Sequence, residues 1–147
     1  MTAEQLSLNL EPVKPEEWRP VVGYEGLYEV SDHGRVRSLS RMIKRAETHG
    51  GGYQQLSGRI LKAITRKYSA HLNVVLHRGD GHQRTVPIHR LVLTAFRGEC
   101  PRGYECCHKD GNAVNNRIEN LRWDTRQANV SDAMRHGTGG RNGTEKL

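Results

Sequence analysis

The chain has 147 residues, of which 35% are hydrophobic and 5% aromatic, which leaves room for one domain or two small modules around a modest core. Its net charge of +7 is unevenly spread: residues 1–34 hold two basic and seven acidic side chains, and residues 35–90 hold twelve basic and two acidic ones. So basic a segment favours a polyanion such as nucleic acid as the partner, with a solvated basic face as the alternative.

Membrane and disulfide-based architectures are disfavoured by the sequence. No apolar run reaches the length of a membrane span, and the N-terminus lacks the basic-then-apolar pattern of a secretion signal. Cys100, Cys106 and Cys107 form no paired CxxC units, which argues against a disulfide framework and a four-ligand structural zinc site. We therefore expect a protein of the reducing cytoplasm that does not contact membranes.

The N-terminal half is predicted to form small antiparallel sheets. A turn at residues 31–34 joins two strands into a hairpin with arginines on one face, and Gly79-Asp80-Gly81 turns a second hairpin. Residues 41–58 contain three consecutive glycines and are predicted to be a loop. Strands are expected at residues 24–30, 35–39, 59–62, 70–77 and 84–88.

A short amphipathic helix is predicted after the second hairpin. Pro87 precedes it and Gly98 follows it, as is typical of the two ends of a helix. Its apolar positions recur at helical spacing and are Ile88, Leu91, Val92, Ala95 and Phe96.

The C-terminal third is predicted to fold as strand, long loop, strand and helix. Residues 104–108 and 120–123 are the strand-like pieces, and the loop between them is polar and rich in Asn and Gly. Asp124 is expected to begin the helix with Gln127 in the capping-box position, and Gly137 to end it. The buried face of this helix is assigned to Ala128, Ala133 and Met134.

Three polar residues of this ββα unit are predicted to converge. His108 ends the first strand, Asn120 begins the second strand beside it, and Asn129 lies in the first turns of the helix. A histidine that takes a proton from water near neutral pH suits hydrolysis. A neighbouring oxygen ligand can hold a hard divalent cation against a phosphate, where the cation stabilises the transition state.

These residues resemble the HNH motif of phage and intron-type homing endonucleases. The resemblance is carried by His108-Lys109-Asp110-Gly111-Asn112, Asn115-Asn116, Asn120-Leu121-Arg122-Trp123 and Asn129, and by the preceding helix beginning His89-Arg90-Leu91-Val92. The segment from Trp18 to Ser38 resembles a modular motif that accompanies homing nucleases. The two resemblances together cover about residues 18–136.

The resemblance implies a role for each matching residue. His108 matches the general base that activates water, Asn120 the middle residue that fixes the backbone and orients that histidine, and Asn129 a metal ligand. Mg²⁺ or Mn²⁺ is the expected ion, with Zn²⁺ as a further possibility. Where the homing members carry a metal-binding aspartate, this chain has Cys107, which departs from the pattern because hard cations prefer oxygen ligands.

Three interpretations of Cys107 remain open. It is a non-ligand beside a shell completed by water and phosphate, a thiolate ligand for a softer ion such as Mn²⁺ or Zn²⁺, or the mark of an impaired nuclease. Cys106 is expected to be a packed core thiol, because neighbours along a strand face opposite sides. His89 is either close to the site or purely structural, His71 is expected to be an ordinary surface residue, and Asn116 to satisfy loop backbone.

The expected architecture is α+β, with a small N-terminal antiparallel sheet followed by a ββα-metal (HNH) unit. The expected divisions are a flexible lead (1–17), a DNA-contacting sheet module (18–87), the nuclease unit (88–136) and a flexible tail (137–147). Candidate phosphate contacts in the basic region are Arg35, Arg37, Arg41, Arg59, Lys62, Arg66 and Lys67.

The leading functional hypothesis is a metal-dependent DNA endonuclease acting on double-stranded DNA as a monomer or homodimer. The resemblance implies a phage or mobile-element protein working in the cytoplasm of a bacterial host. A DNA-binding protein that keeps the fold without the chemistry is the rival. A zinc finger built on Cys100, Cys106, Cys107 and His108 is disfavoured, because strand alternation points adjacent side chains to opposite faces.

Overall fold

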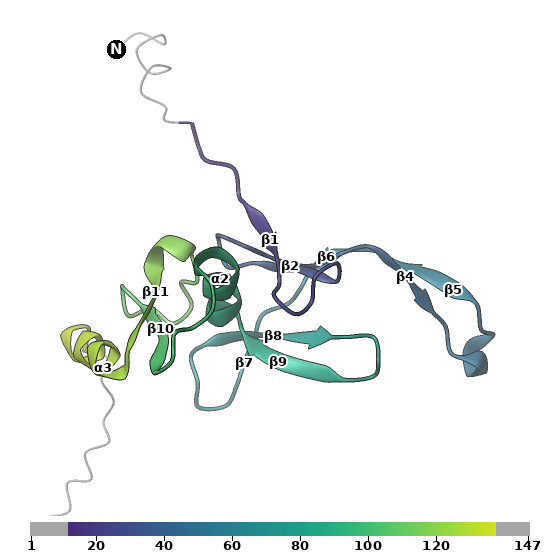
Figure 1. The fold of residues 1–147 in the computed structure, drawn as a ribbon. Helices are drawn as coiled ribbons and strands as arrows, with labels where there is room; N and C mark the ends of the chain where they lie inside the picture. Colours follow the sequence, from purple (N-terminus) through teal and green to yellow (C-terminus); the bar gives the residue numbers. More distant parts are fainter. Residues whose placement is uncertain (1–11, 138–147) are drawn as a thin grey trace, which may run out of the picture.

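The structure, a computed structural model, describes residues 12–137 and has the predicted α+β fold (Figure 1). Its helices are α2 (Ile88–Arg97) and α3 (Arg126–Arg135), with 3-10 turns η1 (Glu47–His49) and η2 (Ile118–Asn120). Its strands are β1 (Trp18–Pro20), β2 (Tyr28–Ser31), β3 (Val36–Ser38), β4 (Arg41–Lys44), β5 (Tyr53–Leu56), β6 (Arg59–Ile60), β7 (Ile64–Thr65), β8 (Leu72–His77), β9 (Gln83–Pro87), β10 (Tyr104–His108) and β11 (Leu121–Thr125).

Strands β2 and β3 form the predicted hairpin and sit in a sheet of order β1-β2-β3-β6. Val30 pairs with Val36 and both are buried, so the hydrophobic side of the hairpin fixes its register. In the connecting turn the Ser31 hydroxyl accepts hydrogen bonds from the backbone N–H groups of His33 and Arg35. Gly34 closes the turn at a φ of +84°, a conformation that favours glycine.

A shared hydrophobic core lies around α2. Val92 and Leu93 of α2 are fully buried and belong to one cluster with Val74 and Leu76 of β8. The same cluster contains buried side chains of the β2–β3 hairpin and, from the C-terminal third, Ile118. Each such side chain removed from water contributes about 1.5–3 kcal/mol, so the N-terminal and C-terminal segments are stabilised together. Among residues 12–137 no helix is long and apolar enough to span a lipid bilayer.

The prediction of a loop over residues 41–58 is wrong, because β4 and β5 pair there as an antiparallel hairpin. The register places Met42 opposite Gln55 and Lys44 opposite Tyr53. Most of the ribbon's side chains are exposed, and it extends away from the rest of the molecule (Figure 1). A ribbon with no buried face lacks the apolar alternation on which strand prediction depends, and its glycine-rich tip suggested a loop instead.

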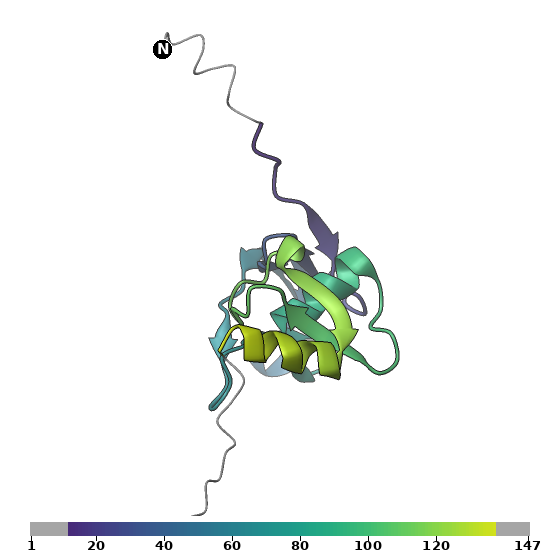
Figure 2. The same ribbon diagram turned by 90° about the vertical axis from the view of Figure 1, so that its left-hand side faces the viewer.

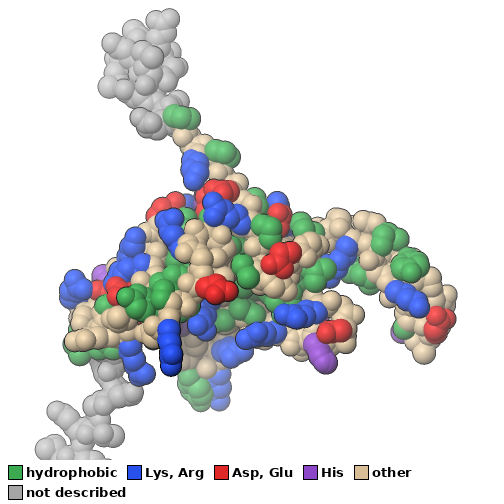
Figure 3. All heavy atoms as spheres, in the orientation of Figure 1, with side chains coloured by type: hydrophobic (Ala, Val, Ile, Leu, Met, Phe, Trp, Pro, Cys, Tyr) green, Lys and Arg blue, Asp and Glu red, His purple; other side chains and the backbone are tan. Residues whose placement is uncertain are grey.

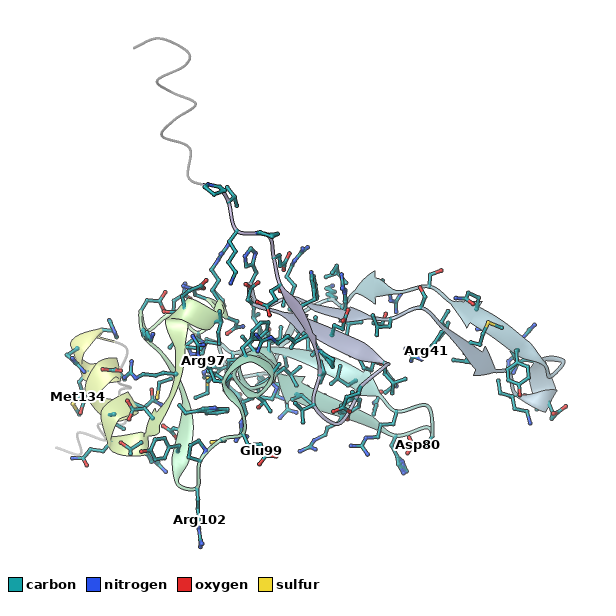
Figure 4. The ribbon with its side chains drawn as sticks, turned by 45° about the horizontal axis from the view of Figure 1, so that its top comes forward. Arg41, Asp80, Arg97, Glu99, Arg102 and Met134 are labelled. Atoms are coloured by element: carbon teal, nitrogen blue, oxygen red, sulfur yellow. The ribbon has the colours of Figure 1, made fainter. Side chains whose placement is uncertain are left out.

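The C-terminal third folds as β10, loop, β11 and α3, in the predicted order. Helix α3 starts at Arg126 and is capped by the Thr125 hydroxyl, which accepts from the Ala128 N–H; Asp124, predicted to begin it, still lies in β11. Met134, predicted to be buried, is 72% exposed on the outer side of α3 (Figure 4), and the buried residue of this helix is Asp132. Asn120, predicted to begin the second strand, ends η2 instead.

Candidate active site

The β10–β11 hairpin and α3 bring the predicted site residues into one region, with α3 lying across the hairpin (Figure 2). His108 pairs with Leu121 at the inner end of the hairpin, and Cys107 pairs with Arg122. Because side chains alternate along β10, His108 faces His89 of α2 and His71, which directly precedes β8, and Cys107 faces away from them.

His108 is held by a side-chain hydrogen bond. His108 is only 8% exposed, and its Nε2 lies 2.9 Å from Oδ1 of Asn116. An amide oxygen only accepts hydrogen bonds, so Nε2 carries the proton and donates it. In the neutral imidazole this leaves the lone pair on Nδ1, the form that can accept a proton from another group.

Asn116 is a site residue that the sequence analysis assigned to loop backbone. It is 3% exposed, and its Nδ2 has no hydrogen-bond partner among the described residues. It packs against the turn of the β2–β3 hairpin, because a Cβ placed on Gly34 would lie 2.7 Å from the Asn116 Cβ and 2.9 Å from its carbonyl oxygen. The Ile118 N–H also donates to the Asp32 carbonyl at 2.9 Å. The N-terminal hairpin therefore supports the loop that holds His108.

Asn120 fixes the loop between β10 and β11. Its Oδ1 accepts from the Asp110 N–H at 3.1 Å, and its Nδ2 donates to the Asp110 carboxylate at 2.9 Å and to the Asn115 carbonyl at 2.8 Å. The Lys109 N–H, next to His108, donates to the Asn120 carbonyl at 2.8 Å. These bonds hold the backbone that follows His108, and none of them involves the imidazole itself.

Asn129 lies on α3 and contacts a carboxylate of β10. Its Nδ2 is 2.6 Å from Oε1 of Glu105, a residue that the sequence analysis did not select. Both side chains line an open hollow of about 610 Å³ together with His71, His89 and Cys106, and its cationic rim is formed by Arg66, Lys67 and Arg90. Carboxylate and amide oxygens are suitable ligands for a hard divalent cation, so this pair fits such an ion.

The adjacent thiols of β10, Cys106 and Cys107, are poorer ligands for a hard divalent cation than Glu105 and Asn129. Burial is the main cause that raises the pKa of Cys107 to about 11 and that of Cys106 to about 12, so both are protonated near neutral pH. Cys107 is 1% exposed, with its Sγ 3.8 Å from the Glu105 carbonyl, whereas Cys106 is partly exposed at the hollow. Cys106 packs against the hydrophobic core, as expected, although Cys107 is the more buried of the two thiols.

Three histidines cluster beside the hollow. The ring of His89 lies 4.8 Å from that of His71 and 5.3 Å from that of His108, and the rings of His71 and His108 are 5.6 Å apart. Sequence analysis placed His71 on the ordinary surface, because a residue 37 positions before His108 carries no local signal of this proximity. Across residues 12–137, no group of three His, Cys, Asp or Glu residues is arranged to hold a metal ion.

Lowering the pH from about 7.5 to about 5.5 is expected to destabilise the protein through His89. Burial, followed by the charges of His71 and His108, lowers the pKa of His89 from 6.5 to about 3. Between the two pKa values the unfolded chain binds a proton that the folded state does not bind. The free energy of unfolding therefore falls by up to about 1.4 kcal/mol per pH unit as the pH is lowered. Urea unfolding at both pH values, with His89→Gln as the less sensitive variant, measures this; equal pH dependence would contradict it.

The seven predicted phosphate contacts fall into three groups. Arg35 pairs with Glu16, and Arg37 pairs with Glu29 at 2.7 Å, so their charges are partly compensated. A hollow of about 700 Å³ is lined by Arg41, Arg59 and Lys62, with Arg41 at the base of the protruding ribbon (Figure 4). The last group, Arg66 and Lys67, lies on the hollow beside Asn129. Lysine and arginine side chains also gather along the lower edge of the body in Figure 3.

Two known families match this chain. The HNH endonuclease family matches residues 86–131, and the NUMOD4 motif matches residues 16–77. DNA endonuclease I-HmuI of Bacillus phage SP01 is 37% identical over 122 residues, which cover 83% of this chain and 60% of that protein. An uncharacterized HNH endonuclease of Acanthamoeba polyphaga mimivirus is 27% identical over 122 residues, which cover 82% of this chain and 30% of the relative.

A solved structure also resembles the fold described above. It is a structure of the HNH homing endonuclease I-HmuI that concerns DNA binding and cleavage by that protein. The two folds superpose with a TM-score of 0.63, and the two sequences are 35% identical. The match covers 83% of this chain and 60% of the other. The chain therefore spans less than two thirds of the length of these relatives.

Proposed function

Because residues 86–131 match the HNH endonuclease family and residues 16–77 match the NUMOD4 motif, we propose that this chain is an HNH endonuclease. It hydrolyses phosphodiester bonds of double-stranded DNA in this proposal, using His108 and one divalent metal ion, Mg²⁺ or Mn²⁺. The observation that carries the proposal is the hydrogen bond from His108 Nε2 to Asn116, which leaves Nδ1 as the proton acceptor. In the proposed reaction Nδ1 takes a proton from the attacking water, and Asn116 keeps the ring in this tautomer.

The proposed metal ligand is Asn129, on the first turns of α3. An ion bound there would neutralise charge on the scissile phosphate and on the leaving oxygen. Asn120 is a positioning residue in this proposal, since its bonds hold the backbone beside His108. Cys107 is proposed to be a non-ligand, because its thiol is buried and neutral and a neutral thiol is a poor ligand for a hard cation.

Relaxation of supercoiled plasmid tests the activity. The purified protein is incubated with plasmid in Mg²⁺, in Mn²⁺ and in chelator, and nicked and linear products are quantified. One HNH unit attacks one strand, so a monomer is expected to give nicked circles and a homodimer to give linear DNA as well. Intact plasmid in both metals, with DNA binding retained, would favour a DNA-binding protein without nuclease activity, an alternative kept open by Cys107 in place of an oxygen ligand.

The proposed setting is the cytoplasm of a bacterial host, because one relative is encoded by a Bacillus phage.

Phosphate contact is proposed for the uncompensated basic residues around the two hollows. Arg66 and Lys67 line the same hollow as the proposed metal ligand, so DNA bound over the site would pass close to them. Arg35 and Arg37 contribute less in this proposal, since each already has a carboxylate partner.

Replacing both Arg66 and Lys67 by Ala is expected to weaken DNA binding and to flatten its salt dependence. Loss of two phosphate contacts lowers the slope of log affinity against log salt concentration by about 2. The matched double variant Arg35→Ala/Arg37→Ala should change the slope by less than about 1, because its charges are compensated. Titrations of a labelled duplex at several salt concentrations in chelator measure both slopes, and equal slopes would refute the assignment.

Replacing Gly34 by Ala is expected to lower the cleavage rate by about tenfold or more, because the new Cβ displaces Asn116 from His108. Gly26→Ala is the matched control: its φ of +77° is similarly strained for Ala, but a Cβ there meets no atom within 4 Å. Both variants should lose about 1 kcal/mol of stability from backbone strain, and only Gly34→Ala should lose activity at saturating DNA. Equal rates for the two variants would exclude this support of the site.

A further inference from the structure

A divalent ion in this site needs an oxygen ligand with negative charge, and β10 offers one carboxylate on the side that faces α3. Cys107 is enclosed at 1% exposure and does not line the open hollow. Two positions earlier, and on the same side of the strand, Glu105 does line it. The carboxylate is therefore open to an ion from solution, whereas the thiol beside His108 is not.

The contact between Glu105 and Asn129 has the spacing of two ligands of one ion. Glu105 Oε1 and Asn129 Nδ2 are 2.6 Å apart, on side chains from different elements. Mg²⁺ binds oxygens at about 2.1 Å in an octahedron, so two adjacent ligand oxygens lie about 3 Å apart. Turning the Asn129 amide by half a rotation exchanges Nδ2 for Oδ1 at nearly the same position. Two oxygens so close repel each other unless a cation lies between them.

The carboxylates of β11 and α3 already have cationic partners. Asp132 pairs with both Arg122 and Arg135, and Asp124 pairs with Arg122 at 2.9 Å. Glu105 makes no ion pair among the described residues, and its side chain accepts a hydrogen bond from Asn129. A carboxylate without a cationic partner is available to bind a metal ion, and this one already contacts the other proposed ligand.

We infer that Glu105 is a metal ligand of this chain and holds the divalent ion jointly with Asn129. The inference rests on the proposed function for the role of Asn129 and extends it by naming the anionic ligand. It also explains how the site can bind a metal ion with a thiol at residue 107. The negatively charged ligand comes instead from two positions earlier on the same strand. Water and phosphate oxygens complete the shell around the ion.

Binding of Mn²⁺ to the full chain in the absence of DNA tests the inference. Electron paramagnetic resonance counts free Mn²⁺ as the ion is titrated into the protein. Glu105→Gln and Asn129→Ala are each expected to weaken binding at least about tenfold, since the first removes the negative charge of the carboxylate and the second removes the amide oxygen. Glu99→Gln is the matched control, because it loses the same charge beyond the end of α2 (Figure 4), and it should bind as the wild type does.

The alternative ligand is tested by Cys107→Ser in the same titration, where unchanged Mn²⁺ affinity is expected. Wild-type affinity in Glu105→Gln, loss of affinity in Cys107→Ser, or no binding by the wild type would each overturn the inference. Thermal unfolding of every variant separates loss of a ligand from loss of the fold. Plasmid nicking together with Glu105-independent Mn²⁺ binding would refute this inference alone. Glu105-dependent binding without nicking would instead refute the proposed function.

Discussion

Replacement of His108 by Ala is expected to lower the rate of DNA cleavage by about 10²- to 10⁴-fold, the usual contribution of a general base. The loss should appear in the rate at saturating DNA and not in DNA affinity, because the buried imidazole contributes no surface for binding DNA. Single-turnover cleavage of a labelled duplex in Mg²⁺ separates the two quantities. Mn²⁺ affinity should also persist, since the ligands proposed here are Glu105 and Asn129.

The control for this variant is His77→Ala, an exposed histidine of β8 outside the histidine cluster, which should cleave at the wild-type rate. Equal cleavage by His108→Ala and the wild type would remove His108 from the mechanism. A parallel loss of rate and of DNA affinity would instead indicate a structural role for this buried ring. Circular dichroism of the variant shows whether its fold is retained, and so distinguishes a structural role from a catalytic one.

Replacement of Asn116 by Asp is expected to slow cleavage about tenfold to a hundredfold at neutral pH, with recovery at higher pH. The carboxylate favours the doubly protonated imidazolium of His108, and an imidazolium has no lone pair with which to accept a proton. The acidic limb of the pH–rate profile should therefore move toward higher pH. Rates measured across the pH range at saturating DNA provide the profile.

Asn112→Asp is the matched control for Asn116→Asp, because it adds the same charge to the same loop at an exposed side chain whose oxygen accepts from the Val114 N–H, as a carboxylate also can. Its acidic limb should stay where the wild-type limb lies. A variant at residue 116 that lost rate uniformly at every pH would show that Asn116 acts on the loop as a whole. That result would contradict its proposed effect on the protonation of His108.

Much of the fold could be predicted because it rests on local signals. The β2–β3 hairpin, the amphipathic pattern of α2 and the order of strand, loop, strand and helix all follow from spacing and turn residues. The β4–β5 ribbon could not be predicted, because it buries little and therefore shows no apolar alternation. The start of α3 was missed because Asp124 and Thr125 are both good cap residues, and strand pairing with β10 retains Asp124.

The site divides in the same way between local and distant signals. His108, Asn120 and Asn129 lie in one continuous motif, so their spacing in the sequence identified them. The proximity of His71 depends on where β8 packs, and that of Gly34 to Asn116 depends on how the N-terminal hairpin meets the loop. Glu105 was overlooked because its significance comes from a contact with α3 across 24 residues. Tertiary packing alone brings these residues to the site.

The tautomer of His108 offers the most direct test of the proposed catalytic centre. Two-bond ¹H–¹⁵N correlation spectra of the histidine side chains, recorded on the wild type and on Asn116→Leu, distinguish the two ring nitrogens. We expect the proton on Nε2 and an unprotonated Nδ1 in the wild type, and loss of this preference in the variant. A His108 that carries its proton on Nδ1 in the wild type would contradict its proposed role as the base that accepts a proton from water.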